Sequence, residues 1–172
     1  MTTSQVPQSP LGSEDVLALD RQVCFALSVA ARNVVAVYRP VLEPLGLTHP
    51  QYLVMLALWE HGSLSVKKLS GLLQLDPGTL SPLLKRLEAA GLLRRERDPE
   101  DQRNLALALT EKGLALRARA EEIPTGIVER LGMPVDELMS LHGALTRVIA
   151  ASQQALAGAV PAEETAPEAT VA

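Results

Sequence analysis

The stretch LDPGTLSPLLKRLEAAG, residues 75–91, predicts an amphipathic helix with a marked beginning and end. Asp76 can accept hydrogen bonds from the free backbone N–H groups of the first turn, and Pro77 suits the first helical position. Gly91 can end the helix. Four leucines at the spacing i, i+3, i+4, i+7 predict one buried face. They are Leu80, Leu83, Leu84 and Leu87.

The other faces of this helix carry small residues, hydroxyls and two cations. They comprise Gly78, Thr79, Ser81, Pro82, Lys85 and Arg86. Such a surface can enter the major groove of DNA and contact phosphates and base edges. We expect all of these residues except Pro82 to face DNA, with Lys85 at the groove edge or on a phosphate.

The next stretch, LLRRERDPEDQRNLALAL at residues 92–109, predicts a basic β-hairpin. Leu105, Leu107 and Leu109 alternate with other residues at the period of a strand, and residues 98–102 have the composition of a turn. The incoming strand carries three arginines. They are Arg94, Arg95 and Arg97.

A shorter helix before residue 75 completes a helix-turn-helix. Ser65 can cap it, its apolar positions repeat with helical spacing, and Gln74 and Leu75 turn into the Asp76 cap. A helix-turn-helix followed by a basic hairpin is typical of a winged DNA-binding domain. Two amphipathic helices and a hairpin also form an ordinary core, so the arginines of the hairpin are what favour DNA binding.

Charge and composition agree with this interpretation and exclude others. The chain has a formal charge of −4, yet residues 67–103 hold eight cations and six acids, a net +2, which leaves −6 elsewhere. A locally basic edge on an acidic protein suits a DNA binder with a large protein–protein surface. One Trp, two Tyr and one Phe are too few for the stacking platforms of single-strand binders.

The sequence predicts a cytoplasmic protein without metal or cofactor. Residues 1–12 lack an apolar run, and the apolar stretch 23–37 is short for a membrane span and contains Arg32 and Asn33. The single cysteine excludes an intrachain disulfide. No zinc-ligand spacing, phosphate loop or dinucleotide motif is visible. A Cys–His hydrolase would need an orienting group and an oxyanion site, so we do not expect an enzyme.

We expect a mainly α-helical fold with a small β-wing, flanked by dimerisation helices. Residues 48–110 would form the DNA-binding lobe, residues 13–47 and 111–157 the dimerisation helices, and 1–12 and 158–172 disordered tails. Ser13 can cap a first helix from Glu14 to about Leu42, which is apolar nearly all round after Arg21. Such a helix needs covering on most sides.

Other signals mark the remaining elements. Thr48 and Gln51 form a capping-box pattern, and residues 63–65 suit a short strand beside the wing. Thr110 can cap a fifth helix that reaches about residues 123–131, with Pro124 kinking or dividing it. After Pro134 a last helix carries a seam close to that of a coiled coil. Its members are Leu138, Leu141, Leu145, Val148, Ser152 and Leu156. Either a partner subunit or the chain's own core can cover this seam, and its distance from the winged helix favours a partner.

The order of elements resembles the MarR family of dimeric bacterial regulators. The motif DQR at residues 101–103 matches the D-x-R signature of the family, and LTEKG at residues 109–113 matches its following helix start. Within the family the chain is similar to the organic hydroperoxide resistance regulators, over residues 19–155. The segments that match are VCFAL (23–27), YRP (38–40), GLTHPQYLVM (46–55) and LDPGTLSPLLKRLE (75–88).

The resemblance implies a role for Cys24. A lone cysteine in an apolar helix is usually an inert buried residue. In these regulators this position holds the peroxide-sensing cysteine, here of the one-cysteine type. Organic hydroperoxide would oxidise the thiolate to a sulfenic acid, and a low-molecular-weight thiol or another chain would then form a disulfide. Tyr38 matches a tyrosine that contacts the cysteine in the subfamily. His49 stands where a second tyrosine is usual, and Ser28 occupies a third aromatic position.

Helix geometry adds a constraint on this site. Fourteen residues separate Cys24 from Tyr38, which is about 21 Å along one continuous helix. Tyr38 would therefore reach the cysteine only from the other subunit. A histidine at position 49 can still donate a hydrogen bond, and a protonated one would lower the pKa of the thiol.

These features together predict a peroxide-responsive transcriptional repressor that binds double-stranded DNA as a homodimer. A homodimer would carry two copies of the DNA-contacting helix at residues 75–91. Two such helices imply a pseudo-palindromic operator with half-sites about one helical turn apart. In the wing we expect Arg103, oriented by Asp101, to reach the minor groove or backbone, together with Arg95 or Arg97. One alternative is a regulator of a small acidic or phenolic ligand, bound between the first helix and the winged domain, with Cys24 structural. Another is an interaction protein that keeps this fold without binding DNA.

Overall fold

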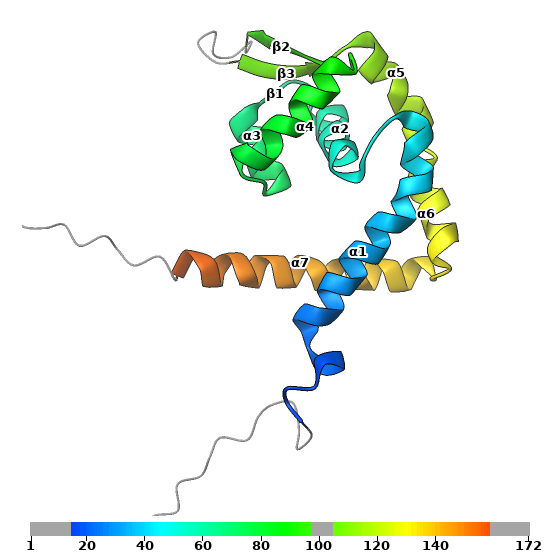
Figure 1. The fold of residues 1–172 in the computed structure, drawn as a ribbon, viewed down its shortest axis with the longest axis vertical. Coiled ribbons are helices and arrows are strands. Elements are labelled where there is room, and N and C mark those ends of the chain that lie inside the picture. The colour runs from blue at the N-terminus through cyan, green and yellow to red at the C-terminus, as the bar shows by residue number, and fades with distance from the viewer. Residues whose placement is uncertain (1–14, 98–104, 159–172) are drawn as a thin grey trace, which may run out of the picture. The chain divides into compact units, whose positions relative to one another are not determined.

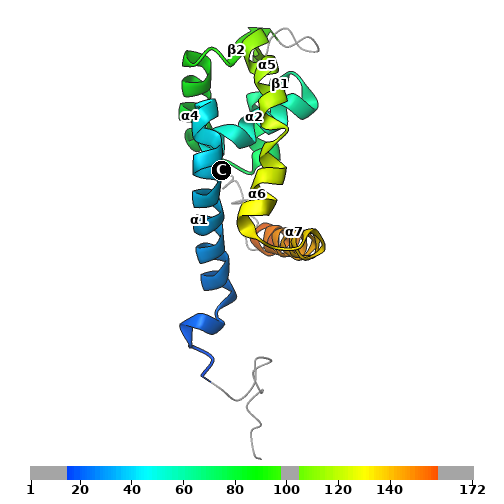
Figure 2. The same ribbon diagram turned by 90° about the vertical axis from the view of Figure 1, so that its right-hand side faces the viewer.

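A computed structural model describes residues 15–97 and 105–158 (Figure 1, Figure 2). The predicted tail 1–12, the Ser13 cap, the wing tip and all but the first residue of the predicted tail 158–172 lie outside the described residues. Gly158 is the last residue of the final helix rather than part of a tail. By their internal contacts the residues form two units, Met1–Arg130 and Leu131–Ala172. The first unit contains the winged helix-turn-helix.

The first helix begins later than the sequence pattern predicts. Helix α1 spans Val23–Leu42 and follows a short 3-10 helix at Leu19–Arg21. The prediction of a helix from Glu14 was therefore wrong for at least residues 15–22. Gln22 is extended and its side-chain amide donates to the carbonyl of Val16 (2.7 Å), which folds this segment into turns. Residues 15–22 bury none of their apolar side chains, and helices draw most of their stability from such burial.

The helix-turn-helix follows the predicted boundaries closely. A 3-10 turn at Glu43–Leu45 leads to α2 (His49–His61), where the backbone N–H of Thr48 donates to the Gln51 side chain (2.9 Å). Helix α3 spans Val66–Leu73, and its Ser65 cap accepts from the N–H of Lys68 (3.2 Å). Gln74 takes a left-handed conformation (φ +52°) and turns the chain into α4 (Pro77–Ala89). The predicted caps are confirmed.

The wing is a three-stranded antiparallel sheet in the order β1-β3-β2. Strand β2 (Leu93–Arg97) pairs with β3 (Leu105–Leu109), in a register that places Leu93 opposite Leu109. The two-residue β1 (Leu64–Ser65) pairs with the other edge of β3, which confirms the predicted strand beside the wing. Figure 1 shows α2, α3 and α4 gathered next to this sheet.

The core lies where α2, α3, α4 and the sheet meet. Its largest fully buried side chains come from all four elements. They include Val54, Met55, Leu58, Leu69, Leu80, Leu84, Leu87, Leu93 and Leu107. Packing of this kind fixes α4, the helix predicted to contact DNA bases, against the wing. This helix therefore has a defined orientation within the lobe.

The remaining helices are α5 (Glu111–Ala120), α6 (Ile123–Leu131) and α7 (Val135–Gly158). The chain divides between α5 and α6 just before Pro124, as predicted. Helix α7 buries none of its residues, and α1 buries only Leu42. Both helices therefore keep apolar surface uncovered within one chain.

The segment Val23–Leu45 also has the length and composition of a membrane span. It holds 23 residues with a mean hydropathy of 1.2. The predicted apolar stretch covered only residues 23–37, whereas α1 and the following 3-10 turn carry the helical segment on to Leu45. Length and composition alone do not separate a membrane span from a helix that another protein surface covers, and Arg32 and Asn33 lie near its middle.

Candidate DNA-reading surface and cysteine site

The N-terminus of α4 is held by a carboxylate cap. Asp76 accepts hydrogen bonds from the backbone N–H of Thr79 (2.9 Å) and from its hydroxyl (2.6 Å). These bonds favour the ionised carboxylate and lower the pKa of Asp76. The hydroxyl proton of Thr79 is used by the cap, so toward DNA this side chain is left as an acceptor.

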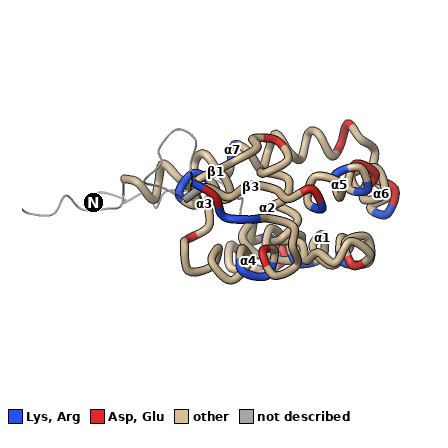
Figure 3. The backbone as a smooth tube through the Cα atoms, turned by 90° about the horizontal axis from the view of Figure 1, so that it is seen from above, with Lys and Arg blue, Asp and Glu red and all other residues tan. Residues whose placement is uncertain are grey.

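The burial of α4 follows the predicted division of its faces. Leu80, Leu84 and Leu87 are almost completely buried, and Leu83 is half-buried. Ser81 is half-buried, and the remaining predicted DNA contacts on this helix are exposed. These are Gly78, Thr79, Lys85 and Arg86. Figure 3 marks the two cations on the α4 backbone. The structure thus brings this set together on one accessible surface.

The three arginines of β2 have different surroundings. Arg94 donates to the carbonyl oxygen of Leu109 (2.6 Å) and pairs with Glu96 (2.8 Å), which ties it to the base of the wing. Arg95 instead reaches Glu88 of α4, with 3.5 Å between Nε and Oε2. Arg97 is exposed at the end of β2. Asp101 and Arg103 lie outside the described residues.

The LTEKG segment connects α5 to the end of the reading helix, a link that sequence reasoning missed. The hydroxyl of Thr110 accepts from the N–H of Gly113 (3.1 Å), as a cap should, and it donates to the carbonyl of Gly91 (2.6 Å). The Lys112 ammonium donates to the carbonyl of Ala90 (2.8 Å). Only the cap had a local sequence signal, because the other two bonds join residues about twenty positions apart.

Cys24 is exposed in the first turn of α1. The same continuous helix contains Tyr38, so the two side chains are about 21 Å apart along its axis and do not meet within one chain. The hydroxyl of Ser28 donates to the carbonyl of Cys24 (2.8 Å). Ser28 therefore bonds to the backbone at this position.

Tyr38 and His49, two of the three predicted sensing residues, lie side by side. Their ring centroids are 5.0 Å apart in an edge-to-face arrangement, and Tyr52 lies 6.1 Å from Tyr38. Burial lowers the pKa of His49 and raises the pKa of Tyr38. The lowered pKa favours the neutral form of His49, which can donate a hydrogen bond through its ring N–H. Activation of the thiol by His49 stays a prediction.

The lowered pKa of His49 predicts a stability change with pH. The unfolded chain has the ordinary histidine pKa of 6.5 and binds the proton more readily than the folded chain. The contribution of His49 to stability is therefore present above that pH and is lost as the pH falls through the folded-state pKa. We expect the free energy of unfolding, measured with urea, to fall more between about pH 7 and pH 5 in wild type than in His49→Gln. Equal declines would contradict the burial argument.

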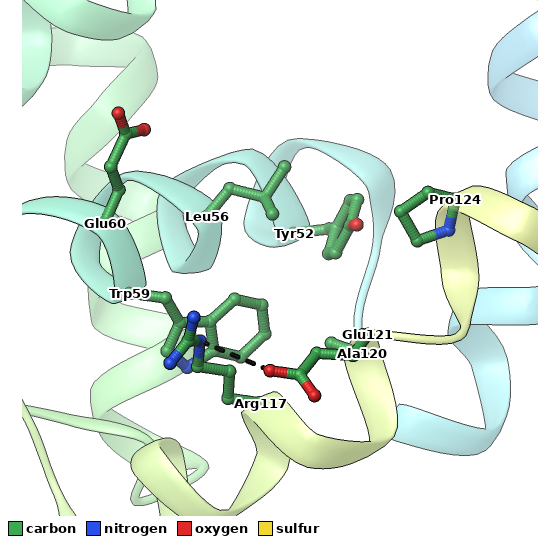
Figure 4. A pocket seen from close by; sticks show the side chains of 8 residues that line it. All are labelled: Tyr52, Leu56, Trp59, Glu60, Arg117, Ala120, Glu121 and Pro124. Carbon is green, nitrogen blue, oxygen red and sulfur yellow. Dashed lines mark ion pairs between the residues drawn. The ribbon is translucent and has the colours of Figure 1, made fainter.

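Two cavities adjoin this aromatic cluster. One of about 460 Å³ lies between the C-terminal part of α1 and the start of α2, and its lining includes Val35, Arg39, Leu47 and His49. The other, of about 490 Å³, lies between α2 and α5 (Figure 4). Tyr52 and Trp59 line it together with Arg117, which pairs with Glu121 at 3.8 Å. The first cavity lies between the first helix and the winged domain, where a regulator of a small acidic or phenolic ligand would bind that ligand.

Comparison with known proteins identifies the family. The MarR family matches residues 47–105. The organic hydroperoxide resistance transcriptional regulator of Bacillus subtilis is 43% identical over 131 residues, which are 76% of this chain and 89% of that protein.

Two solved structures of DNA complexes are also similar. Reduced AbfR bound to DNA is 33% identical, with a TM-score of 0.61 over 76% of this chain and 91% of AbfR. The transcriptional repressor CouR bound to a 23-mer DNA duplex is 27% identical, with a TM-score of 0.71 over 80% of this chain and 99% of CouR. The chain, with its winged helix-turn-helix and its single cysteine, belongs to the MarR family of DNA-binding transcriptional regulators.

Proposed function

We propose that this regulator is a cytoplasmic, homodimeric repressor that senses organic hydroperoxides through Cys24 and releases its operator when oxidised. The observation that carries the proposal is the exposure of Cys24 at the start of α1, where no core packing holds it as an inert apolar residue. The B. subtilis relative is named for organic hydroperoxide resistance. AbfR, another similar protein, has been solved in reduced, overoxidized and disulfide forms.

The proposed chemistry needs one cysteine and two reactants. The Cys24 thiolate attacks the terminal oxygen of the hydroperoxide, the O–O bond breaks, and the alkoxide takes a proton and leaves as the alcohol. Sulfur loses two electrons, which the peroxide gains, and a sulfenic acid remains. A low-molecular-weight thiol then condenses with the sulfenic acid, forming a mixed disulfide and water.

In this proposal the dimer both completes the surroundings of Cys24 and places two copies of α4 at the two half-sites of the operator. Tyr38 and His49 of one subunit would approach Cys24 of the other, because the distance along α1 prevents contact within a chain. Two copies of α4 would read the half-sites of a pseudo-palindromic operator, with Gly78, Thr79, Ser81, Lys85 and Arg86 at the major groove. The wing would add Arg95, Arg97 and Arg103, with Asp101 orienting Arg103.

The test is DNA binding by wild type and Cys24→Ser, measured by fluorescence anisotropy on the duplex upstream of the gene. We expect both proteins to bind when reduced, and only wild type to release DNA after an organic hydroperoxide and a small thiol are added. Intact-mass analysis should show the mixed disulfide on released wild type alone. Release by both proteins, or by neither, would exclude Cys24 as the sensor.

A second candidate function is regulation by a small acidic or phenolic ligand. The cavity of about 460 Å³ beside α1 favours it, because aliphatic side chains line it together with the charged Arg39 and Glu43 and the ring of His49. In that case a ligand would release DNA equally from wild type and Cys24→Ser.

A further inference from the structure

The ion pair between Glu88 and Arg95 joins the reading helix to the wing. Glu88 lies in the last turn of α4, three residues after Lys85 and seven after Ser81, so it continues the polar face proposed to contact DNA. Its Oε2 lies 3.5 Å from Nε of Arg95 on β2, and the two side chains are 41% and 33% exposed. A carboxylate thus stands between the cations of α4, Lys85 and Arg86, and the arginine of β2 with which it pairs.

Arg95 differs from the neighbouring Arg94 in how firmly it is held. Arg94 is fixed by a carbonyl at 2.6 Å and a carboxylate at 2.8 Å. Among the described residues, Arg95 makes one long, partly exposed contact with Glu88. Exposed ion pairs of this kind contribute little to stability. Arg95 can therefore exchange Glu88 for a DNA phosphate at little cost.

This exchange affects specific and non-specific complexes differently. Non-specific binding depends on the summed positive charge along the phosphate backbone, and a paired carboxylate subtracts from that sum. In an operator complex, base contacts of α4 select one register on the DNA, in which Arg95 can leave Glu88 and pair with a phosphate that helps to position the wing. A neighbouring carboxylate therefore weakens non-specific binding more than operator binding.

We propose that Glu88 is a specificity-determining residue, which limits attraction to non-operator DNA by pairing with Arg95. The inference rests on the proposed reading surface of α4 and the wing, and it is independent of redox sensing at Cys24. Its role is to raise the ratio of operator affinity to non-specific affinity, the quantity that matters when many other sites compete.

The experiment measures the affinity of the reduced full-length protein for operator and for a scrambled duplex, as a function of salt. Glu88→Gln keeps an acceptor for Arg95 but removes the charge. We expect about fivefold tighter binding to the scrambled duplex near 0.15 M salt, with a salt slope about 0.9 steeper. Operator affinity should change less than about twofold.

Two further variants separate the explanations. Glu121→Gln makes the same charge change in a pair with Arg117 on α5, and we expect no effect on either duplex. In an Arg95→Gln background, Glu88→Gln should tighten binding to the scrambled duplex clearly less than it does in wild type, because no arginine is then freed. An undiminished effect in that background would show direct repulsion by Glu88 and overturn the proposal. Arg95→Gln alone should weaken binding, and an unchanged affinity and salt slope would remove the wing strand from the reading surface altogether.

Discussion

Replacing Gly113 with alanine should destabilise the protein by about 3 kcal/mol or more, the upper end of what an overpacked site costs. For a chain of this size that corresponds to a fall of roughly 10 °C in the thermal unfolding midpoint. Calorimetry of the reduced protein would measure it.

The expected loss follows from how tightly the start of α5 packs against the end of the reading helix. A Cβ on Gly113 would overlap the carbonyl oxygen of Leu92, and it would lie 3.1 Å from the carbonyl carbon and 3.2 Å from Cδ2 of Leu109. That oxygen cannot easily move, because it accepts the N–H of Thr110 (3.1 Å). The carbonyl of Gly113 also accepts the indole N–H of Trp59 (2.9 Å), so displacement would strain that bond too.

Two other helical glycines give a matched control. Gly71 in α3 and Gly126 in α6 have nothing within 4 Å of an added Cβ. Alanine at either position should be neutral or should stabilise by about 0.5–1 kcal/mol, because it reduces the conformational freedom of the unfolded chain. If Gly113→Ala also left the thermal unfolding midpoint unchanged, the claim that α5 packs closely against the carbonyl of Leu92 would be wrong.

The second large effect concerns assembly. The double variant Leu141→Glu with Val148→Glu should convert the proposed dimer to a monomer. It should also weaken operator binding about 100-fold or more, because two linked DNA-binding lobes gain avidity that a single lobe lacks. The two side chains are 46% and 43% exposed in the single chain and lie on the predicted seam of α7. Burying four carboxylates at such an interface is costly.

Sedimentation and DNA-binding measurements on the same sample test this prediction. Met139→Glu, at a position 65% exposed and away from the seam, is the control and should remain dimeric. Circular dichroism should show helical content in the double variant, which separates loss of assembly from loss of folding. If the double variant stayed dimeric and bound operator DNA with wild-type affinity, the claim that the α7 seam forms the dimer interface would be wrong.

Local signals accounted for the reading helix. The Asp76 cap, the leucine spacing and Gly91 lie within a few residues of one another, and caps and periodicity act at that range. The predicted bounds and buried face therefore match α4. The caps at Ser65 and Thr110 and the bounds of the strand at residues 105–109 also match. The alternation in that strand does not translate into one buried face, because Ala106 and Ala108 are buried like Leu107 and Leu109.

Periodicity was a poorer guide at the start of α1. Val16, Leu17 and Leu19 have helical spacing, yet the chain there forms turns held by Gln22. An apolar pattern specifies which side a helix would bury, but the helix is stable only if a surface is present to cover that side. Among residues 15–97 and 105–158, no such surface covers these side chains.

The sequence by itself determined the winged helix-turn-helix, the family and the position of the lone cysteine, because these depend on short-range spacing and on motifs. Only the tertiary structure decided which arginine is tied down, which one pairs with Glu88, and that Tyr38 meets His49. It also showed why Gly113 must lack a side chain. Each of these contacts joins residues from different elements, and the packing of those elements, rather than local spacing, sets which atoms meet.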